Sequence, residues 1–328
     1  MISVLIVNWN SRTYLRQCLL SLFTHCRSIP LEVIVVDGAS FDGCGEMLAE
    51  EFPSVVFVQS NENVGFAKAN NSAARYATGD YFLLLNPDTL FVEDSIRVML
   101  EQLQSLPDAG AVGCRLLNAD RSLQTSCVQA FPTVLNQMLV SDYLLRRFPA
   151  WKFWGVAPLY ALPPKPAVVE VISGACILLA RSTFNQVGGF SENYFMYGED
   201  LDLCFKLRRS GLFVYHVPLT SVVHLGGGST GQTPSRFSEV MMRESVGIFM
   251  TCNYGRFYSF VYRCAMTLSA IIRVLTIVPL LFFGNRLVKH GMHSWQKWFA
   301  ILLWSVGLEP QKPAPPTPAQ AITPAPSK

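Results

Sequence analysis

The sequence predicts an α/β fold with a mixed, mostly parallel sheet flanked by helices, and two observations carry this prediction. Apolar runs typical of strands recur between residues 3 and 86 with helical stretches between them: SVLIV, LEVIVVD, SVVFVQS and DYFLLLN. Such alternation produces parallel strands joined by right-handed crossovers. A polar cluster directly follows each run. The sheet is therefore expected to carry four polar strand ends at one edge, where open α/β sheets bind ligands.

Composition excludes several other classes of protein. The chain has 328 residues, half of them hydrophobic, which is enough for one large α/β domain or for two. The net charge of +3 and the absence of a basic run interleaved with aromatics argue against nucleic-acid binding. Nine cysteines without a CxxC pair fit reduced thiols in a cytosolic protein. The N-terminal MISVLIVNWN is predicted to be a first strand and not a signal peptide.

The remaining elements follow from local pattern. A first helix is expected from about Ser11, and the stretch from about Ala109 to Lys165 is interpreted as a mobile or substrate-facing insertion, because its periodicity loosens. Order returns with VVEVISGACILLAR, and a helix is expected from near Glu199 to Gly211, where glycine suits a helix C-cap.

The segment LLLNPDT shows how a strand end becomes a candidate site. Proline donates no N–H to a sheet, so the strand should end near Asn86. Asp88 is then expected just beyond the carboxyl end of that strand. The same reasoning places Asn8, Trp9 and Asn10 after the first strand, with Asp37 after the second.

Taken together, six motifs resemble the family 2 glycosyltransferases with a GT-A (Rossmann-like) fold, and most of all the bacterial rhamnosyltransferase-type enzymes. The motifs are VLIVNWNS, VVDGAS, NENVGFAKANN, GDYFLLLNPDT, SGACILLARSTFNQVGGFSENYFMYGEDLDLCFKLRRSG and HLGGGST, and they cover roughly Ile2 to Thr230. The resemblance implies an inverting transferase that moves a sugar, expected to be a deoxyhexose such as rhamnose, from a dTDP- or UDP-sugar donor. The implied acceptor is lipid-linked or a polysaccharide in cell-envelope glycan synthesis.

The resemblance also assigns a divalent cation, Mg²⁺ or Mn²⁺, to Asp88 and His224. Hard oxygen ligands suit such ions, although Asn86 stands here where the family has a first carboxylate. The alternatives are that Asp88 caps a turn or helix and that His224 is a structural histidine at a strand end.

Asp200 is the expected catalytic base, with Glu199 orienting the acceptor or the base. The alternative is that Glu199, Asp200 and Asp202 are acids in the first turn of a helix, where they complement its dipole. Asp202 lies four residues before Lys206, so a local surface ion pair explains it.

The resemblance assigns further residues to the nucleotide-sugar donor. Asp37 is expected to contact the base or ribose, with an Asx turn as the alternative. Lys68 is expected near the diphosphate, with a solvated helix lysine as the alternative. The complete set of expected donor-binding residues is Asn8, Trp9, Asn10, Asp37, Asn63, Gly65, Lys68, Asn70, Asn86, Asp88 and Gly174.

The domain division follows from these assignments. Residues 1–245 form the expected GT-A domain, with a nucleotide-sugar-binding half over 1–115 and an acceptor and catalytic half over 116–245. Residues 246–308 are expected to be an amphipathic helical region for membrane association or oligomerisation, and residues 309–328 a disordered Pro/Ala-rich tail.

The C-terminal region has the composition of a membrane-surface anchor. It contains no acid between Ser245 and Glu309, while six Lys/Arg lie among aromatics and leucines. On a helical wheel Arg256, Arg263 and Arg273 share one face, which predicts an interfacial helix over anionic lipid at the inner face of the cell membrane. A membrane-spanning helix and a buried core or homo-oligomer helix are the alternatives.

Two other functions compete with the transferase. A catalytically idle membrane adaptor with a nucleotide fold is the first. A sugar nucleotidyltransferase is the second, but its Gly-rich, Lys/Arg-bearing loop is absent from VNWNSRTYL after the first strand.

Overall fold

A computed structural model describes residues 1–226, 236–280 and 285–308. Its centre is a nine-stranded sheet in the order β3-β2-β1-β4-β10-β6-β11-β5, with β8 paired to β11. The strands are β1 (Ile2–Asn8), β2 (Leu31–Asp37), β3 (Val56–Gln59), β4 (Tyr81–Leu85), β5 (Thr89–Phe91), β6 (Ala109–Leu117), β8 (Ala167–Val169), β10 (Cys176–Ala180) and β11 (Phe213–His224). A second sheet pairs β7 (Val128–Gln129) with β9 (Val171–Ile172).

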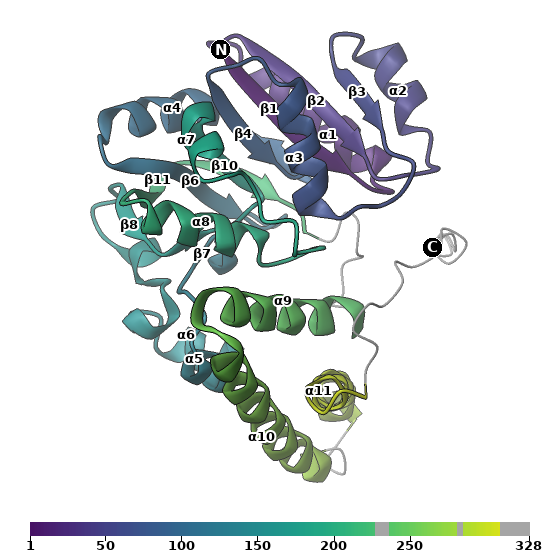
Figure 1. The fold of residues 1–328 in the computed structure, drawn as a ribbon, viewed down its shortest axis with the longest axis vertical. Helices are drawn as coiled ribbons and strands as arrows, with labels where there is room; N and C mark the ends of the chain where they lie inside the picture. Colours follow the sequence, from purple (N-terminus) through teal and green to yellow (C-terminus); the bar gives the residue numbers. More distant parts are fainter. Residues whose placement is uncertain (227–235, 281–284, 309–328) are drawn as a thin grey trace.

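Helices flank the sheet and extend from one end of it (Figure 1). They are α1 (Arg12–His25), α2 (Cys44–Glu51), α3 (Phe66–Tyr76), α4 (Ser95–Ser105), α5 (Val134–Leu139), α6 (Asp142–Arg147), α7 (Arg181–Gln186), α8 (Glu199–Arg209), α9 (Arg236–Tyr254), α10 (Arg256–Leu280) and α11 (Asn285–Ser305). Short 3₁₀ turns cover Thr125–Cys127, Lys152–Trp154 and Ala157–Tyr160. Figure 1 shows α9, α10 and α11 together beside the sheet domain.

The sheet is mixed and mostly parallel, as predicted. Strands β1, β2, β3 and β4 pair in parallel, and β11 runs parallel to β6. Strand β10 is antiparallel to both β4 and β6, so it joins the two parallel groups. Leu83, Leu84 and Leu85 are fully buried, which explains why this strand is a continuous apolar run without alternation.

The expectation of a loose insertion from Ala109 was wrong at its start, because residues 109–117 form β6 in the centre of the sheet. Small residues mask this strand in the sequence. A Cβ added to Gly113 would lie 3.0 Å from Ile172, so close packing of the second sheet requires the glycine there.

Helices α9 to α11 form a second apolar core. Its buried members include Tyr262 and Trp304, whose rings lie 6.0 Å apart. Two polar contacts also join α11 to α9: Lys297 forms an ion pair with Glu239 at 2.7 Å, and the indole N–H of Trp304 donates to Glu244. Residues 246–308 therefore contain a packed helical unit, and the expected boundary at residue 245 falls inside α9.

Two of the three arginines that the helical wheel grouped, Arg263 and Arg273, do not form the expected exposed basic face of α10, whereas Arg256, at the start of the helix, is exposed. Arg263 donates to the carbonyl oxygen of Trp304 and stacks on its ring, with 5.0 Å to the ring centroid. Arg273 donates to the carbonyls of Met138 and Val140 and lies 4.0 Å over the ring of Trp298. Both side chains thus point into the protein.

The opposite face of α10 is apolar and exposed. We call this face the α10 stripe; it consists of Phe257, Phe260, Cys264, Leu268, Ile271, Ile272 and Leu275. The segment Arg256–Ile277 has a mean hydropathy of 1.5 and only 22% of it is buried. Within the described ranges it is the one helix whose length and composition are sufficient to cross a membrane.

All nine cysteines are free. Seven are buried, while Cys252 and Cys264 are exposed. Burial raises the pKa of Cys18, Cys26 and Cys204 to about 12, so these thiols stay protonated and unreactive at neutral pH.

Candidate active site

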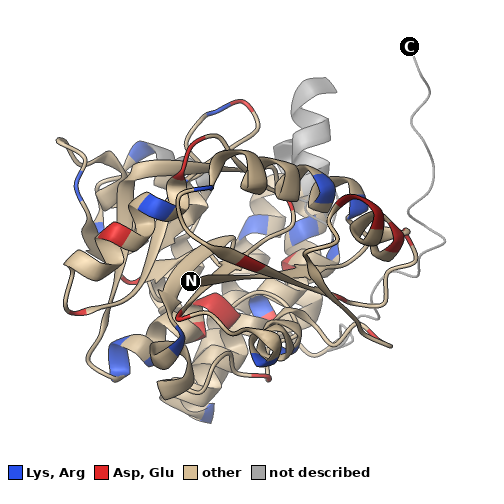
Figure 2. Ribbon diagram, turned by 90° about the horizontal axis from the view of Figure 1, so that it is seen from above, with Lys and Arg blue, Asp and Glu red and all other residues tan. Residues whose placement is uncertain are grey.

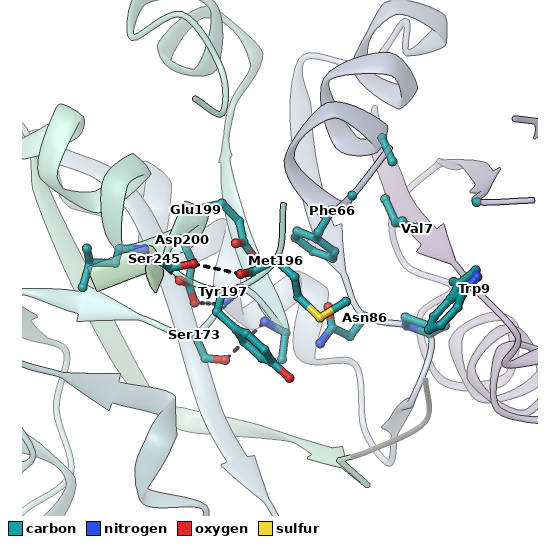
Figure 3. Close-up of a pocket in the computed structure, with 18 of the residues that line it drawn as sticks. Val7, Trp9, Phe66, Asn86, Ser173, Met196, Tyr197, Glu199, Asp200 and Ser245 are labelled. Carbon is teal, nitrogen blue, oxygen red and sulfur yellow. Dashed lines mark hydrogen bonds between the residues drawn. The ribbon is translucent and has the colours of Figure 1, made fainter. Parts of the chain in front are cut away.

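A cavity of about 390 Å³ lies at the carboxyl ends of β1, β2 and β4, with α8 and α9 on its other side. Ten predicted site residues line it: Asn8, Trp9, Asn63, Gly65, Asn86, Asp88, Gly174, Glu199, Asp200 and His224. Figure 3 shows Trp9 on one side of the cavity and Glu199 and Asp200 on the other. The edge of the sheet chosen from the sequence is therefore the edge that carries the cavity.

Asp88 and His224 meet at one corner of this cavity. Antiparallel pairing of β5 with β11 sets His224 opposite Thr89, next to Asp88. The Nε2 atom of His224 lies 3.3 Å from Oδ1 of Asp88 and 3.4 Å from Nδ2 of Asn86. The side chains of Asp88 and His224 are only 8% and 16% exposed.

Gln124 fixes the tautomer of His224. Its amide nitrogen donates to Asn118 and to the His224 carbonyl, so its Oε1 is the atom that faces His224 Nδ1 at 2.7 Å. An acceptor there requires Nδ1 to carry a proton, and in the neutral ring Nε2 then presents a lone pair toward Asp88. A nitrogen lone pair beside a carboxylate is the donor set of a divalent cation.

These residues fit a cation that also takes ligands from a bound diphosphate. Among the described residues, no group of three or more His, Cys, Asp or Glu side chains is arranged around one point. Asp88 and His224 would supply one oxygen and one nitrogen ligand, and the remaining positions are left for substrate oxygens and water.

Two backbone amides hold the side chain of Asp200, one at each carboxylate oxygen. Oδ2 accepts from the Gly174 amide and Oδ1 from the Leu201 amide, each at 2.8 Å. Burial raises the pKa of Asp200, but these two donors favour its charged form. Gly174, expected to bind the donor, therefore also orients Asp200.

The carboxyl group of Glu199, unlike that of Asp200, is buried with one oxygen unpaired within the described part of the chain. It is 7% exposed, and its Oε2 has no hydrogen-bond partner among the described atoms. Burial, followed by the neighbouring charge of Asp200, raises the pKa of Glu199 to about 8. Within this pair Glu199 keeps the proton, and Asp200 is the carboxylate available as a base.

The surface ion pair predicted for Asp202 was wrong in its location. Lys206 does lie 3.7 Å from Asp202, but the Asp202 side chain is only 6% exposed. It accepts from Ser191 Oγ at 2.6 Å and from Tyr194 OH at 3.3 Å. Asp202 therefore ties the chain before α8 to the helix, on the side away from Asp200.

Asp37 is fully buried behind the lining of the cavity. Its carboxylate accepts from Asn8 Nδ2, the Ser40 amide and Gln59 Nε2 at 2.7–2.8 Å. The bond to Ser40 spans three residues, one more than the Asx turn considered as the alternative, and it holds the loop after β2. A direct contact of Asp37 with the nucleotide stays a prediction.

Three more expected donor ligands lie outside the lining. Lys68 is exposed on α3, whereas Asn70 is buried in the same helix and donates to the Phe66 carbonyl. Asn10 has a φ of +48°, and its amide donates to Ser40 Oγ at 2.7 Å. Their roles in donor binding stay predictions.

Several cavity residues were not predicted from the sequence. They are Ser126, Gln129, Ser173, Met196, Tyr197, Met242, Ser245 and Val246, and Gln124 joins them behind His224. Met196 and Tyr197 precede Glu199 in the quoted SENYFMYGED motif, which was a usable signal. Met242, Ser245 and Val246 of α9 had no such signal in the sequence. An amphipathic pattern predicts a helix, but it does not show what the buried face of that helix contacts.

Comparison with known proteins identifies the family of the chain. The glycosyl transferase family 2 model matches residues 3–158. An N-acetylglucosaminyl-diphospho-decaprenol L-rhamnosyltransferase of Mycobacterium tuberculosis is 31% identical over 218 residues, which span 63% of this chain and 70% of that protein. The chain belongs to glycosyltransferase family 2.

A second relative and a solved structure are also similar to the chain. Rhamnosyltransferase WbbL of Escherichia coli K12 is 31% identical over 170 residues, covering 49% of this chain and 60% of that one. Mannosyltransferase PcManGT from Pyrobaculum calidifontis, solved with GDP-Man and Mn²⁺, superposes with a TM-score of 0.55 at 17% identity, over 93% of this chain and 87% of that chain. The GT-A fold, the rhamnosyltransferase-like family and the enzyme class predicted from the sequence are confirmed.

Proposed function

We propose that this family 2 glycosyltransferase moves a deoxyhexose such as rhamnose from a dTDP- or UDP-sugar to a lipid-linked or polysaccharide acceptor of the cell envelope. The observation that carries the proposal is the arrangement of one cavity. It has a carboxylate at Asp200, held by two amides, and a carboxylate beside an imidazole at Asp88 and His224. The rhamnosyl group and lipid acceptor are argued from the Mycobacterium tuberculosis relative.

The proposed reaction is a single inverting displacement. Asp200 takes the proton of the acceptor hydroxyl, the acceptor oxygen bonds to the anomeric carbon, and the bond from that carbon to the nucleoside diphosphate breaks. When bound, Mg²⁺ or Mn²⁺ at Asp88 and His224 would neutralise the departing diphosphate. Protonated Glu199 offers a hydrogen bond to a substrate oxygen.

The donor would occupy the end of the cavity formed by the first three strand ends. Asn8, Trp9 and Asn63 line that end, and Gly38 and Ser60 lie beside them. An indole and several amides suit a nucleotide base and ribose, which need a flat apolar contact and hydrogen-bond donors.

A test of this function uses the full chain with dTDP-rhamnose, UDP-sugars and GDP-mannose as donors. A short-chain N-acetylglucosaminyl diphosphate lipid serves as acceptor. We expect a thermal shift with one donor class and transfer of its sugar. Absence of transfer and of donor hydrolysis with every donor would favour the idle adaptor, whereas pyrophosphate release from a nucleoside triphosphate and a sugar phosphate would favour the nucleotidyltransferase.

We also propose that the enzyme works at the cytoplasmic face of the membrane, docked through the α10 stripe. Seven apolar or thiol side chains face outward there without a charge among them, while Arg263 and Arg273 are used inside the protein. A bilayer suits an uncharged apolar stripe of this kind. The decaprenol in the name of the 31% identical relative favours a lipid occupant over a second copy of the chain.

A further inference from the structure

The short loop Phe195–Gly198, which leads into Glu199, is held from two sides. The Phe66 amide donates to the Phe195 carbonyl at 2.8 Å. Ser245 of α9, only 2% exposed, donates from its Oγ to the Met196 carbonyl at 3.0 Å. The loop thus joins the donor half of the cavity to the C-terminal helices.

These two contacts bring the loop so close to its neighbours that two positions require glycine. A Cβ added to Gly65 would lie 2.3 Å from the Phe195 carbonyl oxygen, so a larger residue cannot occupy that position without moving the loop. A Cβ added to Gly198 would lie 3.1 Å from Cβ of Ser245. Gly65, expected to contact the donor, is therefore also required by the loop.

These contacts hold the loop in an uncommon backbone conformation. Tyr197 has a φ of +66°, followed by +80° at Gly198. A non-glycine residue in the left-handed region is uncommon, and for a bulky side chain it persists only where the surroundings enforce it. Figure 3 shows the result: the Tyr197 ring projects into the cavity, with Ser173 and Asp200 on one side and Asn86 on the other.

The surroundings of Tyr197 differ from the donor end. Beside Tyr197 the cavity is lined by Met196 and by Ser245 of α9, and Met242 and Val246 of the same helix also line the cavity, as does Val171. A ring face and aliphatic side chains suit the C–H face of a pyranose. Since Asp200 must reach the acceptor hydroxyl, the acceptor sugar has to lie beside Asp200, and the Tyr197 ring is next to that position.

We propose that Tyr197 and the cavity face of α9 form the subsite for the acceptor sugar, and that Ser245 is a positioning residue for Tyr197. This proposal rests on the proposed transferase function. It means that the third wall of the active site comes from the helices that carry the α10 stripe, and not from the sheet domain alone.

The test compares Tyr197→Ala and Tyr197→Phe with wild-type full-length enzyme, using the short-chain lipid acceptor. We expect Tyr197→Ala to raise the acceptor KM by about tenfold or more, while donor KM stays within about twofold. Tyr197→Phe keeps the ring, so its acceptor KM should lie between that of the wild type and that of Tyr197→Ala. The exposed Tyr76 of α3, replaced by Ala, is the matched control.

Ser245→Ala tests the positioning role. It should raise the acceptor KM by about threefold to tenfold with donor KM unchanged, and Ser245→Thr, which keeps the hydroxyl, should restore part of the loss. Ser259→Ala is the matched control, because Ser259 also donates from a hydroxyl to a backbone carbonyl, that of Gly247, in the same helices.

Two results would overturn the proposal. If Tyr197→Ala raises donor KM as much as acceptor KM, the ring belongs to the donor subsite. If both KM values stay at wild-type levels, the loop is only scaffold. Wild-type enzyme without transfer to any acceptor would instead refute the transferase function, and calorimetric binding of dTDP and UDP to each folded variant separates that failure from misfolding.

Discussion

His224 Nε2 lies 3.3 Å from Asp88 Oδ1, and the pairing of β11 with β5 creates this contact between distant parts of the chain. Gln124 sets the tautomer that leaves Nε2 free to act as a ligand. The proposed cation site therefore depends on three residues, of which two were predicted.

Removing either ligand should weaken donor binding in the presence of Mn²⁺. We expect Asp88→Ala and His224→Ala each to raise donor KM by about tenfold or more, because the diphosphate charge loses its counter-ion. Excess chelator should abolish transfer by the wild type. Full activity in chelator would remove both residues from the metal role.

The neutral Asn86 predicts that the cation binds mainly together with the nucleotide. Calorimetry should find weak Mn²⁺ binding to the free enzyme and tighter binding with UDP or dTDP present. Asn86→Asp adds a carboxylate 3.4 Å from His224 Nε2, and we expect it to tighten Mn²⁺ binding to the free enzyme. Equal affinity in both proteins would place the ion elsewhere.

Asp200 and Asp202 give a matched pair of substitutions in one helix. Asp200→Asn should lower kcat by about 10² or more, because the base is lost while the diphosphate contacts remain. Asp202→Asn should keep most of the turnover and lower the thermal midpoint instead, since it breaks a buried network with Tyr194 and Lys206. Wild-type turnover in Asp200→Asn would overturn the assignment of the base.

The raised pKa of Glu199 predicts a pH-dependent cost in stability. The unfolded chain releases this proton near the ordinary glutamate pKa of 4.5, while the folded protein keeps it up to about pH 8. The free energy of unfolding therefore falls as pH rises through this window. Glu199→Gln has no such proton, so its Tm relative to wild type should rise between pH 5 and pH 8 by at least about 1–2 °C, the shift that 1 kcal/mol produces in a chain of 328 residues. A constant Tm difference would contradict the assignment of the proton.

The inward arginines change the expected behaviour at a membrane. Flotation of the full chain with vesicles should persist at high salt and differ little between zwitterionic and anionic lipid, because the α10 stripe is uncharged. Replacing Phe257, Phe260 and Leu275 with serine should lower vesicle binding by at least about tenfold. Arg97→Ser on the exposed face of α4 serves as the control.

Other occupants of the α10 stripe would give different results. A spanning helix would resist extraction by alkaline carbonate. A dimer interface would show as a change in molar mass by light scattering, abolished by the same serine substitutions, with no vesicle binding at any salt concentration.

Local pattern was sufficient for the elements with continuous apolar runs. Strands β1, β2 and β4 were predicted because they are buried on both faces, and Pro87 marked where β4 ends. Strand β6 was missed because Gly110 and Gly113 make room for neighbouring side chains, which removes the apolar signal. That requirement arises from packing between elements.

The site was predicted to the extent that its residues lie at strand ends or in quoted motifs. A helical wheel placed Arg256, Arg263 and Arg273 on one face of α10, but it does not show that Arg256 meets solvent while Arg263 and Arg273 contact the protein. Gln124 and Ser245 have no local signal, because each acts through a contact with a residue far along the chain, His224 and Met196.

The positions of the exposed thiols allow α10 to be labelled with a dye at one site. Cys264 lies in the middle of the α10 stripe, and Cys252 is the other exposed cysteine. A Cys252→Ser variant would leave a single accessible site for a maleimide dye, without any engineered cysteine. An environment-sensitive fluorophore on Cys264 would then report directly, in real time, whether α10 leaves water for lipid.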